Sequence, residues 1–244
     1  MSHQTTNTLD ILYRFDCADG KERRFDLHLD PLTLEQVTPP PEVCAPWTRL
    51  EFHQCANCPL SVESDRYCPV AVRLQSLEAG FAGLWSYDEL QMKVITPERT
   101  ISATTTAQKG ASSLLGLMIA TSGCPHAAYF RPMARFHLPL ASEEDTIYRG
   151  TSMYLLAQYF RTKAGQQAEF DFAGLTEIYR QLRIINVALA ERLRSASDKD
   201  TSINAVILLD LFARAMPHSI DDDLSDLRYL FARYTQRASQ DGEI

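Results

Sequence analysis

The stretch LDILYRFDCADGKERRFDLHLD, residues 9–30, decides how the fold begins. Apolar residues alternate with mostly polar ones on both sides of Asp19-Gly20, a dipeptide typical of tight hairpin turns. A period of two places alternate side chains on one face of a strand. We therefore expect an antiparallel β-hairpin whose core face is formed by Ile11, Tyr13, Phe15, Cys17, Phe25, Leu27 and Leu29.

The next hundred residues combine a connector, a short helix and a second hairpin. Four prolines within residues 37–46 exclude regular structure there and indicate an extended connector. A helix can begin at Pro69, because proline suits the first turn of a helix. Two β-prone runs on either side of Thr96-Pro97-Glu98-Arg99 predict the second hairpin.

From about residue 107 onward the pattern is helical. A capping-box-like pair, Ser142 and Asp145, predicts a helix start. The buried side of that helix is expected to hold Ile147, Met153, Leu156, Tyr159 and Phe160. The most regular stripe follows three-four spacing and comprises Leu175, Ile178, Leu182, Ile185, Leu189 and Leu193. After a helix over 203–216, we expect a break at Pro217 and a last helix opened by Ser219.

These elements predict an α+β fold: a small N-terminal antiparallel sheet with a cysteine-containing loop, followed by a mainly α-helical bundle. We place an α+β segment at residues 1–105 and a helical domain at 106–244. A single domain is the alternative, because the helix after residue 107 can pack directly on the sheet.

Three cysteines lie close together in FHQCANCPLSVESDRYCP, residues 52–69. Cys55 and Cys58 form a C-x2-C pair, a spacing that lets two thiolates on one turn bind a single ion. A loop can bring Cys68 back to the same point. The segment therefore supplies three candidate metal ligands.

The fourth ligand must come from elsewhere, and Cys124 is our preferred candidate. Like Cys58 and Cys68, it precedes a proline, and a residue before proline is held extended. Cys44, His53, His126 and His137 remain alternatives.

The chemistry of such a site stays open at this point. Structural zinc is favoured by the thiolate spacing, and an iron–sulfur cluster is the main alternative. A redox-active dithiol is disfavoured, because no strand-to-helix junction of a βαβ unit carries the pair. Absence of metal is the remaining reading.

A second candidate site lies in SGCPHAAYFRPMARFHLPLASEEDTIYRG, residues 122–150. Here Cys124 could act as a nucleophile with His126 or His137 as its base. A core position for His137 is the plainer interpretation, since Phe136 and Leu138 flank it. No phosphate-binding glycine loop, G-x-S-x-G or H-E-x-x-H motif occurs, so we lean towards a non-enzymatic role.

Composition limits the partners. The 244-residue chain has a formal net charge of −7 and no cluster of Lys and Arg, which argues against nucleic-acid binding. Its longest apolar run, 111–124, is too short to span a bilayer. We expect a cytoplasmic, metal-binding protein that acts as a regulatory or protein-interaction module, through a partner or by self-association, without binding membranes.

Overall fold

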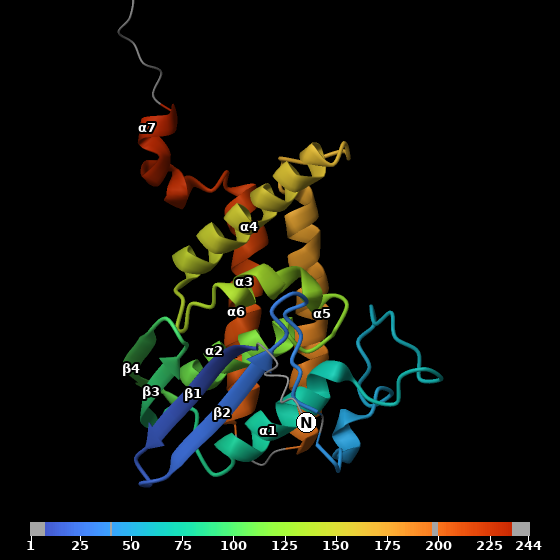
Figure 1. The fold of residues 1–244 in the computed structure, drawn as a ribbon, viewed down its shortest axis with the longest axis vertical. Coiled ribbons are helices and arrows are strands. Elements are labelled where there is room, and N and C mark those ends of the chain that lie inside the picture. The colour runs from blue at the N-terminus through green and yellow to red at the C-terminus, as the bar shows by residue number, and fades with distance from the viewer. Residues whose placement is uncertain (1–7, 40, 197–199, 236–244) are drawn as a thin grey trace, which may run out of the picture.

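Two hairpins form one antiparallel sheet in the computed structural model, which describes residues 8–39, 41–196 and 200–235 (Figure 1). Its strands are β1 (Leu9–Cys17), β2 (Glu22–Leu29), β3 (Glu89–Ile95) and β4 (Thr100–Thr106). In the described residues the sheet has four strands in the order β2-β1-β3-β4. Both predicted hairpins and the α+β class are confirmed.

The register places the expected apolar residues on one face of the sheet. Tyr13 pairs with Phe25 on β2 and with Val94 on β3, and all three side chains are buried. The opposite face carries polar side chains such as Arg14 and Lys93. The period-two alternation therefore sets which side of the sheet meets the core.

Two helices, α1 (Pro69–Phe81) and α2 (Ala107–Ala120), cover the buried face of the sheet (Figure 1). Each approaches it through a glycine. A Cβ atom on Gly80 would lie 2.4 Å from the ring of Phe25, and one on Gly110 would lie 2.9 Å from the ring of Phe15. Since real Cβ atoms do not come so close, only glycine permits these two contacts.

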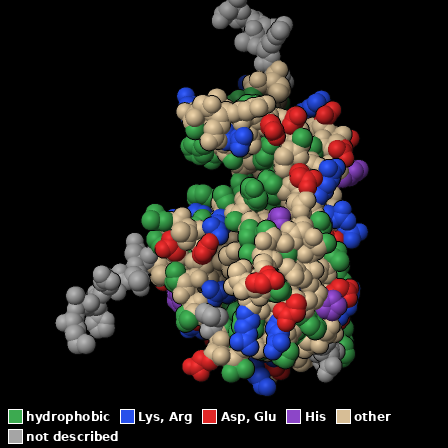
Figure 2. Space-filling view, turned by 90° about the vertical axis from the view of Figure 1, so that its right-hand side faces the viewer, with side chains coloured by type: hydrophobic (Ala, Val, Ile, Leu, Met, Phe, Trp, Pro, Cys, Tyr) green, Lys and Arg blue, Asp and Glu red, His purple; other side chains and the backbone are tan. Residues whose placement is uncertain are grey.

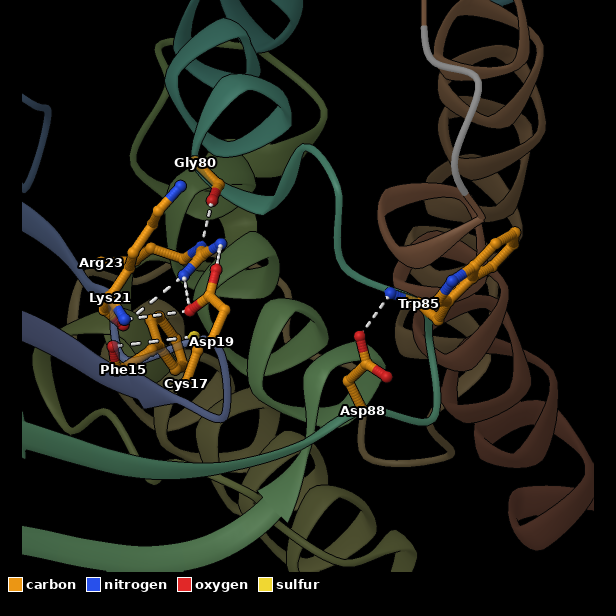
Figure 3. Close-up of polar contacts among 8 residues, drawn as sticks. All are labelled: Phe15, Cys17, Asp19, Lys21, Arg23, Gly80, Trp85 and Asp88. Atoms are coloured by element: carbon orange, nitrogen blue, oxygen red, sulfur yellow. Dashed lines mark hydrogen bonds and ion pairs between the residues drawn. The ribbon is translucent and has the colours of Figure 1, made fainter.

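The tip of the first hairpin is fastened to α1 (Figure 3). Arg23 donates its Nε hydrogen to the carbonyl oxygen of Gly80 at 2.9 Å and pairs with Asp19 at 2.9 Å. Asp19 also accepts a hydrogen bond from the backbone N–H of Lys21 at 3.0 Å. The turn residues thus fix both the hairpin and its position on the helix.

The remaining elements are mostly helical. They are η1 (Pro46–Thr48), η2 (Ala127–Phe130), α3 (Arg131–Arg135), α4 (Glu143–Lys163), α5 (Ala173–Ala196), α6 (Thr201–Asp221), η3 (Ser225–Phe231) and α7 (Ala232–Thr235). Helix α6 packs against α2, α4 and α5. The predicted capping box at Ser142 and Asp145 is present at the start of α4. One hydrophobic cluster extends from Ile11 on β1 to Leu227 on η3.

The predicted buried side of α4 is wrong in part. Leu156, Tyr159 and Phe160 are 50–61% exposed, whereas the buried positions include Gly150 and Thr151. A Cβ atom on Gly150 would lie 2.7 Å from Met216 Cε and 2.9 Å from Tyr179 Oη, so neighbouring helices approach α4 at its small residues. Close packing selects this face, and the larger apolar side chains of α4 are left towards solvent.

The predicted helix break at Pro217 is also wrong. Helix α6 continues through this proline to Asp221, and Ser219, expected to open a last helix, lies in the final turn of α6 instead. A proline removes only one N–H donor from the helix, and Ala213 and Met216 are fully packed beside it. Their burial holds the last turn in place.

One helix among the described residues, α6, is long and apolar enough to cross a membrane by length and composition, with a mean hydropathy of 1.2. Core helices pass the same test, and α6 contacts four other described helices, α1, α2, α4 and α5. Figure 2 shows that the molecule is hollowed on one side and that hydrophobic side chains gather along both edges of the hollow.

Candidate metal centre

The C-x2-C pair lies on a turn held by its own backbone and by α5. The N–H of Cys58 donates to the carbonyl oxygen of Cys55 at 3.0 Å. Between them, Asn57 donates its side-chain amide to the carbonyl oxygen and to Oε1 of Gln181, at 3.2 and 2.7 Å. The turn that carries both thiols is therefore anchored to α5.

Cys68 occupies the N-cap position of α1. Its N–H donates to the carbonyl oxygen of Thr48 at 2.9 Å, and its own carbonyl oxygen accepts from Val72 at 3.1 Å. Its backbone is extended, as expected for a residue before proline, and its side chain is buried. The start of α1 thus fixes the third thiol.

The segment that carries Cys124 lies next to the C-x2-C turn and to the start of α1. Gly123 adopts a left-handed conformation, φ +94°, and a Cβ atom there would lie 4.0 Å from Cβ of Pro69, the residue after Cys68. His126 donates from Nε2 to the carbonyl oxygen of Asn57 at 2.7 Å. Cys124 therefore lies on a loop in contact with the C-x2-C turn and with the start of α1.

The four thiols influence one another electrostatically. Burial, with the thiols of Cys68, Cys58 and Cys124 acting in the same direction, raises the pKa of Cys55 to about 12. Burial also raises the pKa of Cys124, with Cys68 and Cys58 acting in the same direction against the N–H groups of Ala127 and His126. The four predicted ligands come from three separate segments, and the thiols of Cys68 and Cys58 act on the pKa of both Cys55 and Cys124.

All six cysteines are free thiols. Across the described ranges, no group of three or more His, Cys, Asp or Glu side chains is already arranged to hold a metal ion. Among the described residues, the four sulfurs therefore do not form a coordination sphere.

A buried cation lies beside the thiols. Arg192 on α5 is 1% exposed and donates to the carbonyl oxygens of Trp47, Arg49 and Leu50, at 2.8, 2.7 and 3.0 Å. Its Nε has no hydrogen-bond partner. The guanidinium lowers the pKa of Cys55, opposing the larger effect of burial. Its charge therefore acts on the cluster.

The other candidates for the fourth ligand have different surroundings. Cys44 contacts the carbonyl oxygen of Pro41, with Sγ at 3.8 Å, and the ring of His53 packs edge-on against Phe52. The Nε2 atom of His126 is used in the bond to Asn57. Neither Cys44 nor His53 is among the groups that shift the pKa of Cys55. Cys124, by contrast, is one of those groups.

The nucleophile hypothesis receives no geometric support. His137 is hydrogen-bonded to the hydroxyl of Tyr13, and burial lowers its pKa to about 3. In the part of the chain that is described, no hydrogen bond joins His137 or His126 to the thiol of Cys124. The raised pKa of Cys124 also disfavours a thiolate at neutral pH.

Cys17 lies apart from the cluster, at the end of β1, where its thiol contacts the carbonyl oxygen of Phe15 at 3.8 Å (Figure 3). It is a buried residue of the sheet, as the alternation of the first hairpin predicts.

Sequence reasoning missed the supporting residues Asn57, Gln181 and Arg192. Only Arg192 had a readable signal: it follows Leu189 by three positions, which places it at the edge of the apolar stripe on α5. The partners of Asn57 and Gln181 depend on how α5 crosses the cysteine loop, which local patterns do not encode.

Comparison with known proteins shows one relationship. The family model described as "Domain of unknown function (DUF6901)" matches residues 11–232, which include all the predicted ligands and both hairpins except the first two residues of β1. Neither the curated proteins nor the solved structures gave a significant match. The chain therefore belongs to the DUF6901 family.

Proposed function

We propose that Cys55, Cys58, Cys68 and Cys124 bind one structural zinc ion, and that the protein is a non-enzymatic, cytoplasmic interaction module. The observation that supports this proposal is the position of the Cys124 loop. Gly123 lies next to Pro69, and His126 is hydrogen-bonded to Asn57. Zinc held by four thiolates is typical of closed structural sites.

The charge of Arg192 supports an anionic occupant. A buried guanidinium without an acidic partner is unfavourable unless negative charge lies nearby. Four thiolates around Zn²⁺ carry a net charge of −2, which one guanidinium partly compensates. If the thiols are neutral, the hydrogen-bond partners of the Arg192 guanidinium are backbone carbonyl oxygens, which carry no net charge.

A zinc ion here would act as a clasp between the two parts of the chain. Cys55 and Cys58 belong to the cysteine loop, Cys68 begins α1, and Cys124 follows α2. Because ligands must lose their protons, zinc would stabilise the folded chain by its binding free energy at neutral pH. A small movement of the loop that carries Cys55 and Cys58 towards Cys68 and Cys124 would complete the coordination sphere.

Metal analysis of protein purified without oxygen tests this proposal. We expect a colourless sample with about one zinc per chain, as a single four-thiolate site requires. Cys58→Ser should lose the metal and melt at a lower temperature. Cys44→Ser, which changes a cysteine outside the cluster, should retain the zinc and the native melting temperature.

Two outcomes contradict the zinc assignment. A brown sample that contains iron and sulfide supports the iron–sulfur alternative at the same four cysteines. A metal-free sample whose melting temperature is unchanged by Cys58→Ser overturns the metal site altogether.

The interaction part of the proposal is supported by α4. Leu156, Tyr159 and Phe160 lie at three-four spacing on its solvent side and are 55%, 50% and 61% exposed. Large apolar side chains in a contiguous exposed stripe are typical of protein-binding surfaces. Self-association through this stripe predicts a dimer by light scattering that Phe160→Glu converts to a monomer. A monomeric native chain at all concentrations contradicts it.

A further inference from the structure

A cavity of about 550 Å³ lies among the helices, away from the cysteine cluster. Its walls come from the end of β4, from α2, α4, α5 and α6, and from the segment that joins η2 to α4. The volume falls within the range of roughly 300–1,000 Å³ found for small-molecule sites. Leu208, Leu209 and Phe212 form the α6 wall, and Phe130 faces the cavity from η2.

One polar side chain in the wall of the cavity has no partner. Asn186 is 1% exposed, and neither its Oδ1 nor its Nδ2 atom is hydrogen-bonded. A buried amide without partners is unfavourable, because each of its polar atoms has given up its hydrogen bonds to water. Tyr179 and Leu182 precede it at spacings of seven and four on α5, so all three face the same cavity. A ligand that hydrogen-bonds Asn186 would remove this cost.

The charged side chains that line the cavity are basic. Lys109, His137 and Arg149 line the cavity, and none of the described lining residues is an Asp or a Glu. In the described part of the chain, no ion pair involves Lys109 or Arg149. The guanidinium of Arg149 donates only to the carbonyl oxygens of Met133 and Phe136, at 2.8 and 2.9 Å.

Asp145 is an acid that acts on this charge. Burial lowers the pKa of Arg149, and the smaller effects of Tyr179 and Asp145 raise it. However, the carboxylate of Asp145 is engaged by the N–H and hydroxyl of Ser142 in the cap of α4. An apolar cavity with two basic side chains therefore favours a ligand with an apolar body and one anionic head.

We propose that this cavity binds a small amphipathic carboxylic acid of the fatty-acid class. The acyl chain would lie against the apolar side chains of α2 and α6. The carboxylate would accept a hydrogen bond from Nδ2 of Asn186 and be attracted by Lys109 and Arg149. This site is independent of the proposed metal centre.

Calorimetric titration of the full chain with laurate tests the proposal, with dodecanol as the uncharged control of equal chain length. We expect saturable binding of laurate with one site per chain and at least tenfold weaker binding of dodecanol. Laurate should also raise the melting temperature, because it binds the folded state.

Two variants separate recognition from folding. Asn186→Leu should weaken laurate binding by about tenfold and raise the melting temperature of the free protein, since it removes an unpartnered buried amide. Those two changes have opposite signs, so misfolding cannot produce both. Lys109→Met should weaken laurate binding, whereas Lys21→Met in the first hairpin should not.

The proposal is overturned if folded protein fails to bind laurate. Equal affinity for laurate and dodecanol overturns it as well, because recognition of the anionic head is then missing. Unchanged binding by Asn186→Leu and Lys109→Met would place any bound laurate outside this cavity and overturn the assignment.

Discussion

His126 donates a hydrogen bond to the carbonyl oxygen of Asn57 across 2.7 Å, and so fastens the Cys124 loop to the turn between Cys55 and Cys58. The two residues are 69 positions apart in the chain. Because Asn57 is itself bonded to Gln181, the contact joins three segments. It is the most direct link between the two halves of the proposed zinc clasp.

Removal of this link should loosen the fourth ligand. We expect His126→Ala to weaken zinc binding by roughly 10–100-fold, the usual effect of losing a group that orients a metal ligand. Competition with a chromogenic chelator measures the change. His28→Ala, which removes a half-exposed histidine on the sheet, is the matched control and should leave the affinity as it is. Equal losses in both variants contradict the orienting role.

Arg192 should contribute to both stability and metal affinity. Arg192→Met leaves three carbonyl oxygens without their charged donor, and we expect a loss of about 3 kcal/mol in the free energy of unfolding. Denaturant titration measures it. Zinc affinity should fall in the same variant and recover in part in Arg192→Lys, which keeps the charge.

Arg194→Met provides the control for Arg192, since Arg194 lies on the same helix but is exposed and paired with Glu191. If Arg192→Lys binds zinc no better than Arg192→Met, charge compensation by this residue is not what stabilises the site.

His137 should make the fold sensitive to mild acid. Burial lowers its pKa to about 3, whereas an unfolded histidine titrates near 6.5. The unfolded chain therefore binds the proton first, so stability is complete above pH 6.5 and falls as the pH drops towards 3.

Since His137 is only partly buried as a residue, we expect a loss of about 1–2 kcal/mol between pH 7.5 and 5. Denaturant titrations at both pH values should show this loss in the native chain and a smaller one in His137→Gln. An identical pH dependence in the two proteins would show that the imidazole does not carry the effect.

Local sequence patterns predicted the sheet and α5 because each element buries a continuous apolar face. Tyr13 and Phe15 follow the strand period, and Leu189 and Leu193 follow the helical one. They failed on α4, where Gly150 allows two neighbouring side chains to approach closely and thereby selects the buried side. Tertiary packing, which no local period records, decided that face.

The four cysteines of the proposed site were selected from the sequence, whereas their surroundings were not predictable from it. Cysteine spacing and the Cys-Pro pairs indicated Cys55, Cys58, Cys68 and Cys124. The contacts around them, from Thr48, Gln181 and Arg192, come from segments up to about 140 residues away. Their roles follow from helix crossings that emerge only in the folded chain.

X-ray absorption at the zinc edge of the purified protein tests the central claim most directly, because it reports the ligand atoms themselves. A zinc ion held by the four cysteines should show a single shell of four sulfur atoms at roughly 2.3 Å. Loss of one sulfur from that shell in Cys124→Ser would confirm the fourth ligand. A shell of nitrogen or oxygen atoms, or the absence of bound zinc, would contradict the account.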